Sequence, residues 1–385
     1  MAVLRKISPL IFLLFFYSAT AQDFHYSLIN TSPLNLNPAL TGIFDFDYIN
    51  KHVRYTGNYR QQWRSVASDY LNVATPFTTA SLSIDGMIKR AKSISRHYGG
   101  VGVYGNNDRA GDLGFGTQQF GLALAYHQAI GEGYHYVSGG ASYGWNIRSF
   151  DINNAYFDNQ WNGLTFDPTL STGENFPSTR FTFPDLNFGV AFHNYSQQRI
   201  SYQIGLGVFH LLQPKQSFYL NPADERLKRK FAAHGLLRIP LELNKSILPS
   251  INYIQQGSQR EGYILGFYKY DHSHTDAPGK PVKTIGFQVG GGYRAVRNID
   301  TQISTDAMIL AAKFRKDALV IGAAYDINLS GLGAATQGRG AFELSIIYYM
   351  DLYKSDRKPH VKPDKVKCPP GQQKKSQTTP DEWKY

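Results

Sequence analysis

Most of this chain consists of segments in which apolar and polar residues alternate with a period of two, and an export signal precedes them. Residues 5–6 are basic, residues 10–17 are continuously apolar, and the three residues before Gln22 are small, as a leader peptidase requires. We therefore predict a cleaved signal peptide over residues 1–21. Because no Cys lies at this junction, a lipid anchor is not expected.

No later stretch approaches the roughly 20 consecutive apolar residues that a membrane helix needs. In lipid every backbone amide must be hydrogen-bonded within the protein, so an exported chain of this kind can span a membrane only as a closed barrel. Its 26 Tyr, 24 Phe and 36 Gly are typical of barrel strands with aromatic belts. Charged residues make up 18% of the chain, below the roughly 25% of soluble domains. The predicted fold class is all-β, a transmembrane antiparallel β-barrel.

The clearest alternating segment is the last one. Its even-numbered residues from Phe342 to Leu352 are apolar, whereas the odd-numbered residues from Glu343 to Asp351 include only two apolar side chains. Such segments have about the ten residues that a tilted membrane strand needs. About 14 strands are predicted, near residues 52–63, 77–88, 98–107, 117–130, 133–149, 184–195, 198–211, 229–240, 246–256, 261–271, 282–294, 304–315, 317–328 and 339–351. An even number predicts that both termini are periplasmic.

The connections between these segments differ in length. Those near Gly131, Ser196 and Lys316 are very short and follow even-numbered strands, as periplasmic turns do. The longest connections, roughly residues 150–183 and 212–228, follow strands five and seven. We therefore expect these two long loops on the outer side of the membrane.

Two features do not follow this pattern cleanly. The connections near residues 91–97 and 272–281 come after even-numbered strands, yet they are longer than periplasmic turns usually are. The lumen side of the strands is rich in Gly, Ala, Ser and Gln, which does not predict a wide aqueous pore. An open lumen and a lumen closed by the long loops both remain possible interpretations.

Segments of different composition flank the barrel, which is predicted over residues 51–352. Residues 22–50 do not alternate and contain Pro33 and Pro38, so we place them as a periplasmic segment before the barrel or folded into its periplasmic mouth. Residues 353–385 contain nine Lys/Arg and four Asp/Glu, a net charge of +5. A basic tail can bind nucleic acid, but this one lacks periodicity and is rich in Pro and Lys. We predict a disordered periplasmic tail and no nucleic-acid partner.

The sequence contains no convincing catalytic, metal-binding or cofactor-binding site. Cys368 is the only cysteine, which excludes a disulfide framework and a Cys-based metal site. Residues 140–144 match the G-x-S-x-G nucleophile elbow in letters, but that motif needs a strand, a sharp turn and a helix, and these residues lie within one strand. Possible metal ligands share one connection, where a solvated polar turn is the favoured interpretation: Asp271, His272, His274 and Asp276. No enzyme is predicted.

Aromatic residues lie among polar ones in the first long loop, and they have two interpretations. They can cap the barrel by packing on one another. Alternatively they can contact a partner protein, because loops on rigid scaffolds often carry recognition and aromatic anchors dominate interfaces. The candidate residues are Tyr156, Phe157, Trp161, Phe166 and Phe176.

Four short motifs, in this order and spacing, resemble the PorP/SprF family of outer-membrane proteins. They are the segments Asn37–Gly42, Tyr59–Trp63, Phe183–Gly189 and Gly205–Pro214, and the likeness extends over essentially the whole barrel. Pro38 biases the residue before it to an extended backbone, and an indole at the end of the first strand suits a membrane interface. The positions that we single out from these motifs are Asn37, Pro38, Ala39, Gly42, Arg60, Gln62, Trp63, His210 and Pro214.

This resemblance implies a function in type IX secretion and gliding, without a cofactor. The protein is then expected in the outer membrane, helping to export or anchor a specific cargo or adhesin that carries a carboxy-terminal sorting domain. Its expected partners are that cargo, other secretion components in the outer membrane and periplasm, and the lipid bilayer. The basic tail departs from the family pattern. A passive porin or uptake channel is the main alternative, and an outer-membrane enzyme or a soluble exported β-sandwich are further ones.

Overall fold

The computed structural model describes most of the predicted barrel and the segment that precedes it. The described residues are 23–48, 51–63, 75–88, 96–131, 135–154, 157–174, 176–195, 199–218, 225–275, 282–297, 303–331 and 333–352. The predicted signal peptide, the basic tail with Cys368, and residues Tyr156 and Asp276 lie outside them.

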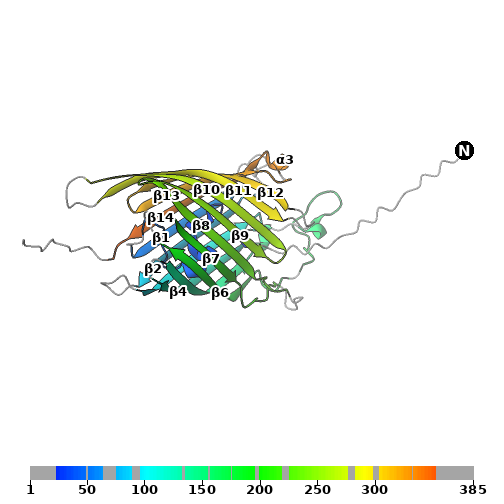
Figure 1. The fold of residues 1–385 in the computed structure, drawn as a ribbon. Coiled ribbons are helices and arrows are strands. Elements are labelled where there is room, and N and C mark those ends of the chain that lie inside the picture. Colours follow the sequence, from blue (N-terminus) through cyan, green and yellow to red (C-terminus); the bar gives the residue numbers. More distant parts are fainter. Residues whose placement is uncertain are drawn as a thin grey trace, which may run out of the picture. The chain divides into compact units, whose positions relative to one another are not determined.

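Fourteen strands run through the described residues and form one closed antiparallel barrel, in which β1 pairs with β14 (Figure 1). The predicted fold class and strand number are confirmed. The strands are β1 (Val53–Gln62), β2 (Phe77–Ile88), β3 (His97–Ala110), β4 (Phe115–Ile130), β5 (His135–Ser149), β6 (Arg180–Asn194), β7 (Ser201–Phe209), β8 (Lys230–Glu242), β9 (Lys245–Gln256), β10 (Gln259–His274), β11 (Lys283–Arg297), β12 (Ile303–Lys316), β13 (Leu319–Asn328) and β14 (Arg339–Met350).

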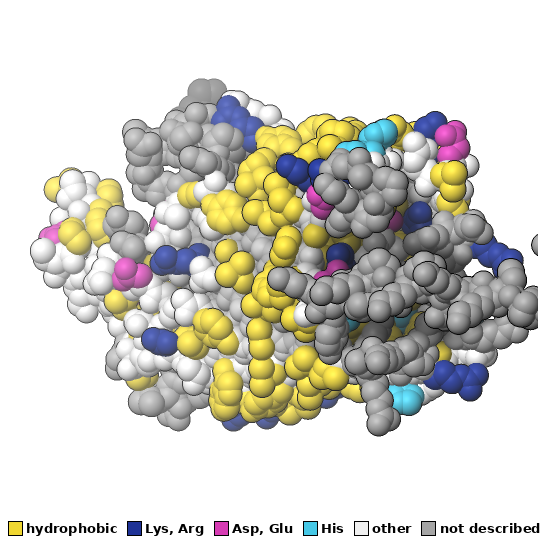
Figure 2. All heavy atoms as spheres, turned by 90° about the vertical axis from the view of Figure 1, so that its left-hand side faces the viewer, with side chains coloured by type: hydrophobic (Ala, Val, Ile, Leu, Met, Phe, Trp, Pro, Cys, Tyr) yellow, Lys and Arg dark blue, Asp and Glu magenta, His cyan; other side chains and the backbone are white. Residues whose placement is uncertain are grey.

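The alternation along each strand separates an apolar outer face from a polar lumen. In β14, the side chains of Phe342 and Leu344 are exposed on the outside, whereas those of Glu343 and Ser345 are buried inside. On the face shown in Figure 2, hydrophobic side chains gather in a band, with charged side chains on either side. An apolar band of this kind suits the hydrocarbon layer of a membrane.

The two ends of the barrel differ. We call one end the turn end, because it carries the short connections after β8 and β12 and the last residue of β14, Met350. We call the other the loop end, because it carries the long connections after β5 and β7. The predicted alternation of short and long connections holds for most of the barrel. The exceptions include the two-residue connection after β9 at the loop end and the longer connection after β10 at the turn end.

The described helices are all single turns: η1 (Ile29–Thr31), α1 (Pro33–Leu36), η2 (Pro38–Leu40), η3 (Ile152–Asn154), η4 (Asp158–Gln160) and α3 (Gly333–Thr336). None of them has the length and apolar character that crossing a membrane requires. The first three belong to the segment that precedes β1, and the next two to the loop after β5.

Residues 23–48 lie inside the barrel, and we call this segment the plug. The backbone amide of Asp23 donates to Gln256 at the loop end (2.8 Å), and the hydroxyl of Tyr48 donates to the carbonyl of Asp317 at the turn end (3.0 Å). The plug therefore runs along the lumen. The sequence predicts a segment that lies before the barrel or is folded into its periplasmic mouth, and the plug extends further than this. It follows that Asp23 and Met350 lie at opposite barrel ends.

Candidate functional site

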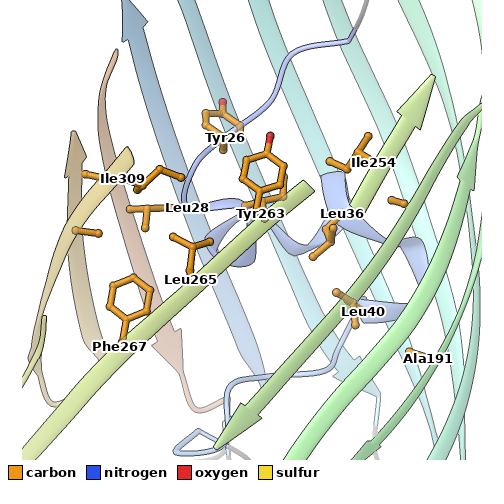
Figure 3. Packing of buried hydrophobic residues seen from close by; sticks show 14 of the residues in the cluster. Tyr26, Leu28, Leu36, Leu40, Ala191, Ile254, Tyr263, Leu265, Phe267 and Ile309 are labelled. Carbon is orange, nitrogen blue, oxygen red and sulfur yellow. The ribbon is translucent and has the colours of Figure 1, made fainter. Parts of the chain in front are cut away.

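The plug packs against the inner wall through a continuous hydrophobic cluster. Leu28, Leu36 and Leu40 of the plug meet wall residues such as Tyr263 and Leu265 of β10 (Figure 3). All five side chains are almost completely buried. Burying a Leu side chain contributes roughly 1.5–3 kcal/mol relative to leaving it in water. The apolar residues of this non-alternating segment thus find their partners on the lumen side of distant strands.

Wall glycines let the plug backbone approach the strands closely. A Cβ atom on Gly140 of β5 would lie 2.5 Å from the carbonyl oxygen of Pro38 and 2.6 Å from the Cα atom of Ala39. A Cβ atom on Gly189 of β6 would lie 1.9 Å from the side-chain oxygen of Asn37. Because no real Cβ atom can sit at these distances, the plug can approach the wall this closely at Gly140 and Gly189 only because these positions have no side chain.

Asn37 connects the plug to three strands. Its side-chain amide donates to the carbonyls of Val190 (3.0 Å) and Leu206 (3.2 Å) and lies 3.1 Å from Nε2 of His234. Its side-chain oxygen accepts from the amide of Ala39 (2.8 Å), which caps the short helix η2. The backbone of Asn37 is extended, as predicted for the residue before Pro38.

A buried cluster of charges holds the start of the plug at Ser27. Arg60 of β1 forms ion pairs with Glu343 of β14 and with Asp326 of β13 (2.9 Å to the latter), and it donates to the hydroxyl of Ser27 (3.1 Å). Arg294 of β11 pairs with the same Asp326 carboxylate (3.0 Å) and also donates to Ser27 (3.0 Å). Glu343 accepts from the backbone amide of Ser27 (2.5 Å). Buried charges are tolerated only when they are paired in this way.

A second polar group, which we call the clasp, fixes Asp23 at the loop end. Nε2 of His210 lies 2.8 Å from Asp23, Nδ1 of His210 lies 3.0 Å from Asp185, and the ammonium of Lys230 lies 2.8 Å from Asp23. Burial alone lowers the pKa of His210, but the two carboxylates outweigh it and raise that pKa to about 9. Burial alone raises the pKa of Asp23, but His210 and Lys230 hold it well below its ordinary value.

A third group holds the plug further toward the turn end. Arg54 of β1 makes a two-bond contact with Asp85 of β2 (2.9 and 2.8 Å) and donates to the carbonyl of Ile43 (2.8 Å). Asp85 also accepts from the amide of Gly42 (2.7 Å). Gly42 has a φ of +79°, and its position leaves only 3.0 Å between a Cβ atom and Gly100, so glycine suits it on both counts.

The turn end is less completely filled. A hollow of about 920 Å³ opens there, lined by Asp47 of the plug and by Arg238, Asp271 and Arg315 of the wall among others. Near the clasp, by contrast, the described residues leave a cavity of only about 20 Å³ beside Asp23. The plug therefore leaves far more room at the turn end than at the clasp.

The motif positions singled out from sequence divide into two sets. Six belong to the plug or to its anchors: Asn37, Pro38, Ala39, Gly42, Arg60 and His210. The other three lie near the loop end, where β1 and β7 end: Gln62, Trp63 and Pro214. Trp63 (φ 61°) and His210 (φ 59°) have left-handed backbones directly after or near the end of a strand. Such conformations are uncommon for residues other than glycine, and the motif alone does not predict them.

The candidate partner-contact residues of the first long loop behave differently from one another. Phe157 and Phe176 contact each other (6.4 Å between ring centroids), and Phe176 packs on Phe150 (5.1 Å), which packs on Phe218 of the loop after β7 (4.8 Å). These residues form an aromatic cap that joins the two long loops. The side chain of Trp161 remains 58% exposed, and that of Leu164, three residues later in the same turn, is 85% exposed. Phe166 forms an isolated bridge with Trp161.

The residues that sequence analysis considered as a possible nucleophile elbow or metal site have structural surroundings instead. Residues 140–144 lie within β5, without the sharp turn of a nucleophile elbow. Asp271 pairs with Lys269 (2.9 Å) and Arg315 (3.0 Å), so its carboxylate already has cationic partners. His272 and His274 stack on each other (6.0 Å). Within the described ranges, no three His, Cys, Asp or Glu residues are grouped as a metal site requires.

Residues 18–348 match the protein family described as type IX secretion system membrane protein PorP/SprF. The chain belongs to the PorP/SprF family. The resemblance noted from the four sequence motifs is therefore confirmed. As a PorP/SprF protein with a barrel fold, it is an outer-membrane protein with a function in type IX secretion. No protein of curated function matches it.

Solved structures with a similar fold are other outer-membrane barrels. They include the monoaromatic hydrocarbon channel TodX as a ΔS2S3 mutant (9% identity, TM-score 0.41, 83% of this chain and 94% of that one). Another is the toluene transporter TbuX of Ralstonia pickettii (8% identity, TM-score 0.39, 84% and 94%). A third is the beta domain of the Bordetella autotransporter BrkA (11% identity, TM-score 0.34, 77% and 99%). At these scores the likenesses carry no argument about function.

Sequence analysis of this PorP/SprF protein singled out two residues that anchor the plug, Arg60 and His210, but missed the others. Arg294, Asp326 and Glu343 are isolated charges in alternating strands, and nothing in their spacing links them to Ser27. One signal was available: charged residues at lumen positions need partners, and the barrel wall alone does not supply all of them. The segment without alternation was the remaining source of such partners.

Proposed function

We propose that this protein is a non-enzymatic component of the type IX secretion and gliding machinery. It helps to export a specific cargo or adhesin, or anchors it at the cell surface. The barrel is a rigid support, its long loops face outward and bind the cargo's carboxy-terminal sorting domain, and its turn end faces other secretion components in the periplasm. The expected periplasmic tail belongs to the same proposal.

The observation that carries this proposal is the plug. The lumen holds a folded segment, which is fixed by hydrogen bonds between Ser27 and buried ion-paired wall residues and by the clasp at Asp23. Such a barrel offers poor passage to solutes. The same fixing makes the barrel a stable platform, and recognition on such platforms is usually performed by the loops. Long, aromatic-rich loops at one end support this view.

The experiment is a deletion of the gene, followed by comparison of the proteins at the cell surface. We expect one or a few surface proteins with carboxy-terminal sorting domains to be lost from the surface and either retained inside the cell or released to the medium. Complementation with the wild-type gene should restore them. An unchanged set of surface proteins in the deletion strain would overturn the proposal.

A passive porin is the alternative, and the hollow of about 920 Å³ at the turn end favours it most. The two functions differ in conductance. In planar bilayers the plugged protein should give little or no steady current, whereas a porin gives steady channels. A variant that lacks residues 23–48 should conduct if it folds. Steady channels from the wild-type protein would favour the porin.

A further inference from the structure

We infer that the turn at residues 161–166, which we call the tip, is the surface that binds the exported partner. We further infer that this partner presents an apolar pocket bordered by Lys and Arg. The inference rests on the proposed function, because it names the surface through which that function operates. Its evidence is the rigidity of the tip, the exposure of two apolar side chains and the charge of the surrounding loop.

The tip has a fixed shape before any partner binds. The side-chain oxygen of Asn162 accepts from the amides of Leu164 and Thr165 (2.9 Å each), and Trp161 forms a bridge with Phe166. Beneath it, the buried side chain of Gln160 donates to the carbonyl of Leu170 (3.3 Å). A preorganised turn loses little conformational entropy when it binds, which favours affinity.

The segments on either side of the tip are held in place by the aromatic cap. Phe157 and Phe176, at the two sides of the loop, pack into the cap that joins both long loops. The aromatic residues of this loop therefore differ in their surroundings: Phe157 and Phe176 pack in the cap, whereas Trp161 remains largely exposed. Phe157, Phe166 and Phe176 are half-buried, whereas Trp161 is 58% exposed, and an exposed Trp of this kind is typical of a binding surface.

Two large apolar side chains remain exposed on this rigid turn. Trp161 is 58% exposed and Leu164 is 85% exposed, and both lie beyond the ends of β5 and β6. Trp is among the residues that most often contribute large shares of binding energy, when they enter a well-packed pocket of the partner. The tip therefore fits a partner with a pocket of that size.

The charge of the loop indicates which surface the partner presents. The chain as a whole has a net charge of +11, but residues 150–179 contain no Lys or Arg. Their acidic residues are Asp151, Asp158, Asp167 and Glu174. An acidic loop is repelled by the phosphates of an outer-membrane leaflet, so the apolar tip is not suited to rest on that membrane. It is suited to a basic protein surface.

The test uses the double variant Trp161→Ala/Leu164→Ala of the full chain. Trp145→Ala is the matched control, because Trp145 is 55% exposed but lies on the outer wall of β5. The binding probe is the purified carboxy-terminal domain of the protein that the deletion strain loses from its surface. We expect the double variant to bind it at least tenfold more weakly and to lower its surface display, whereas Trp145→Ala changes neither.

Charge is tested with Asp158→Lys, which should weaken binding several-fold at low salt and less at high salt. Unaltered binding in the double variant overturns the inference, even if gene deletion removes the cargo and so supports the proposed function. If the deletion leaves surface proteins unchanged, the proposed function fails first. Binding of the wild-type protein to vesicles containing lipid A, lost in the double variant while cargo binding is retained, would assign the tip to the membrane and also overturn the inference.

Discussion

Arg60 shows at the scale of one residue why the plug and the barrel are a single folded unit. Its guanidinium contacts Ser27 of the plug and the carboxylates of Glu343 and Asp326 in the last two strands. All four side chains are buried. Sequence motifs pointed to Arg60, but they did not reveal its two carboxylate partners, because those lie more than 250 positions later in the chain. Only the closure of the barrel between β1 and β14 brings them together.

We expect Arg60→Gln to destabilise the protein by about 3–5 kcal/mol, because it leaves two buried carboxylates without one of their cations. The control is Lys51→Ala, which removes the partly exposed ion pair between Lys51 and Asp351 (2.7 Å). That change should cost at most about 1 kcal/mol. The measurement is the urea midpoint of the loss of heat-modifiable gel migration. Equal midpoints for the two variants would contradict this account of Arg60.

At the scale of an element, β5 shows how one strand serves two environments. Gly139 faces outward and a Cβ atom there would meet nothing within 4 Å, whereas one on Gly140 would strike the plug backbone at Pro38 and Ala39. Alternation along the sequence predicts that neighbouring residues face opposite sides. It does not predict that a second segment lies against one of those sides.

Two neighbouring substitutions test this difference. Gly140→Ala should cost about 1–3 kcal/mol, because a methyl group overpacks against backbone that cannot move aside. Gly139→Ala should be neutral or slightly stabilising, because Gly in a strand interior is less favourable than Ala. Thermal unfolding followed by gel migration measures both. We also expect current fluctuations from Gly140→Ala in planar bilayers, where the wild-type and Gly139→Ala proteins stay closed. The interpretation fails if the two variants cannot be distinguished.

For the whole molecule, sequence predicts the wall and misses what fills it. The fourteen strands are predictable because each has one face toward lipid and one toward the lumen, so the pattern is visible within about ten residues. The plug has no such pattern, since its residues are buried on every side by strands that are remote in sequence. The burial of Leu28 and Leu40 against the inner wall therefore cannot be predicted from the sequence around them.

The clasp gives the whole molecule a dependence on pH that can be worked out from its charges. The pKa of His210 is raised to about 9 from its unfolded value of roughly 6.5. The contribution of protonated His210 to the free energy of unfolding is then complete below pH 6.5 and is lost as the pH rises through 9. The lowered pKa of Asp23 acts in the opposite direction: its contribution is complete above roughly pH 4 and is lost in stronger acid. The clasp should therefore be strongest between about pH 4 and 6.5.

From pH 6.5 to 9.5 we expect the free energy of unfolding to fall by about 3 kcal/mol because of His210 alone, since each unit of pKa shift corresponds to about 1.4 kcal/mol. The variant His210→Asn should lose most of this slope, because Asn cannot become a cation. Asn also accepts the left-handed backbone found at this position (φ 59°), so the loop itself should persist. Urea unfolding of both proteins over this range measures the slope, and parallel curves for the two would show that the clasp does not hold the plug.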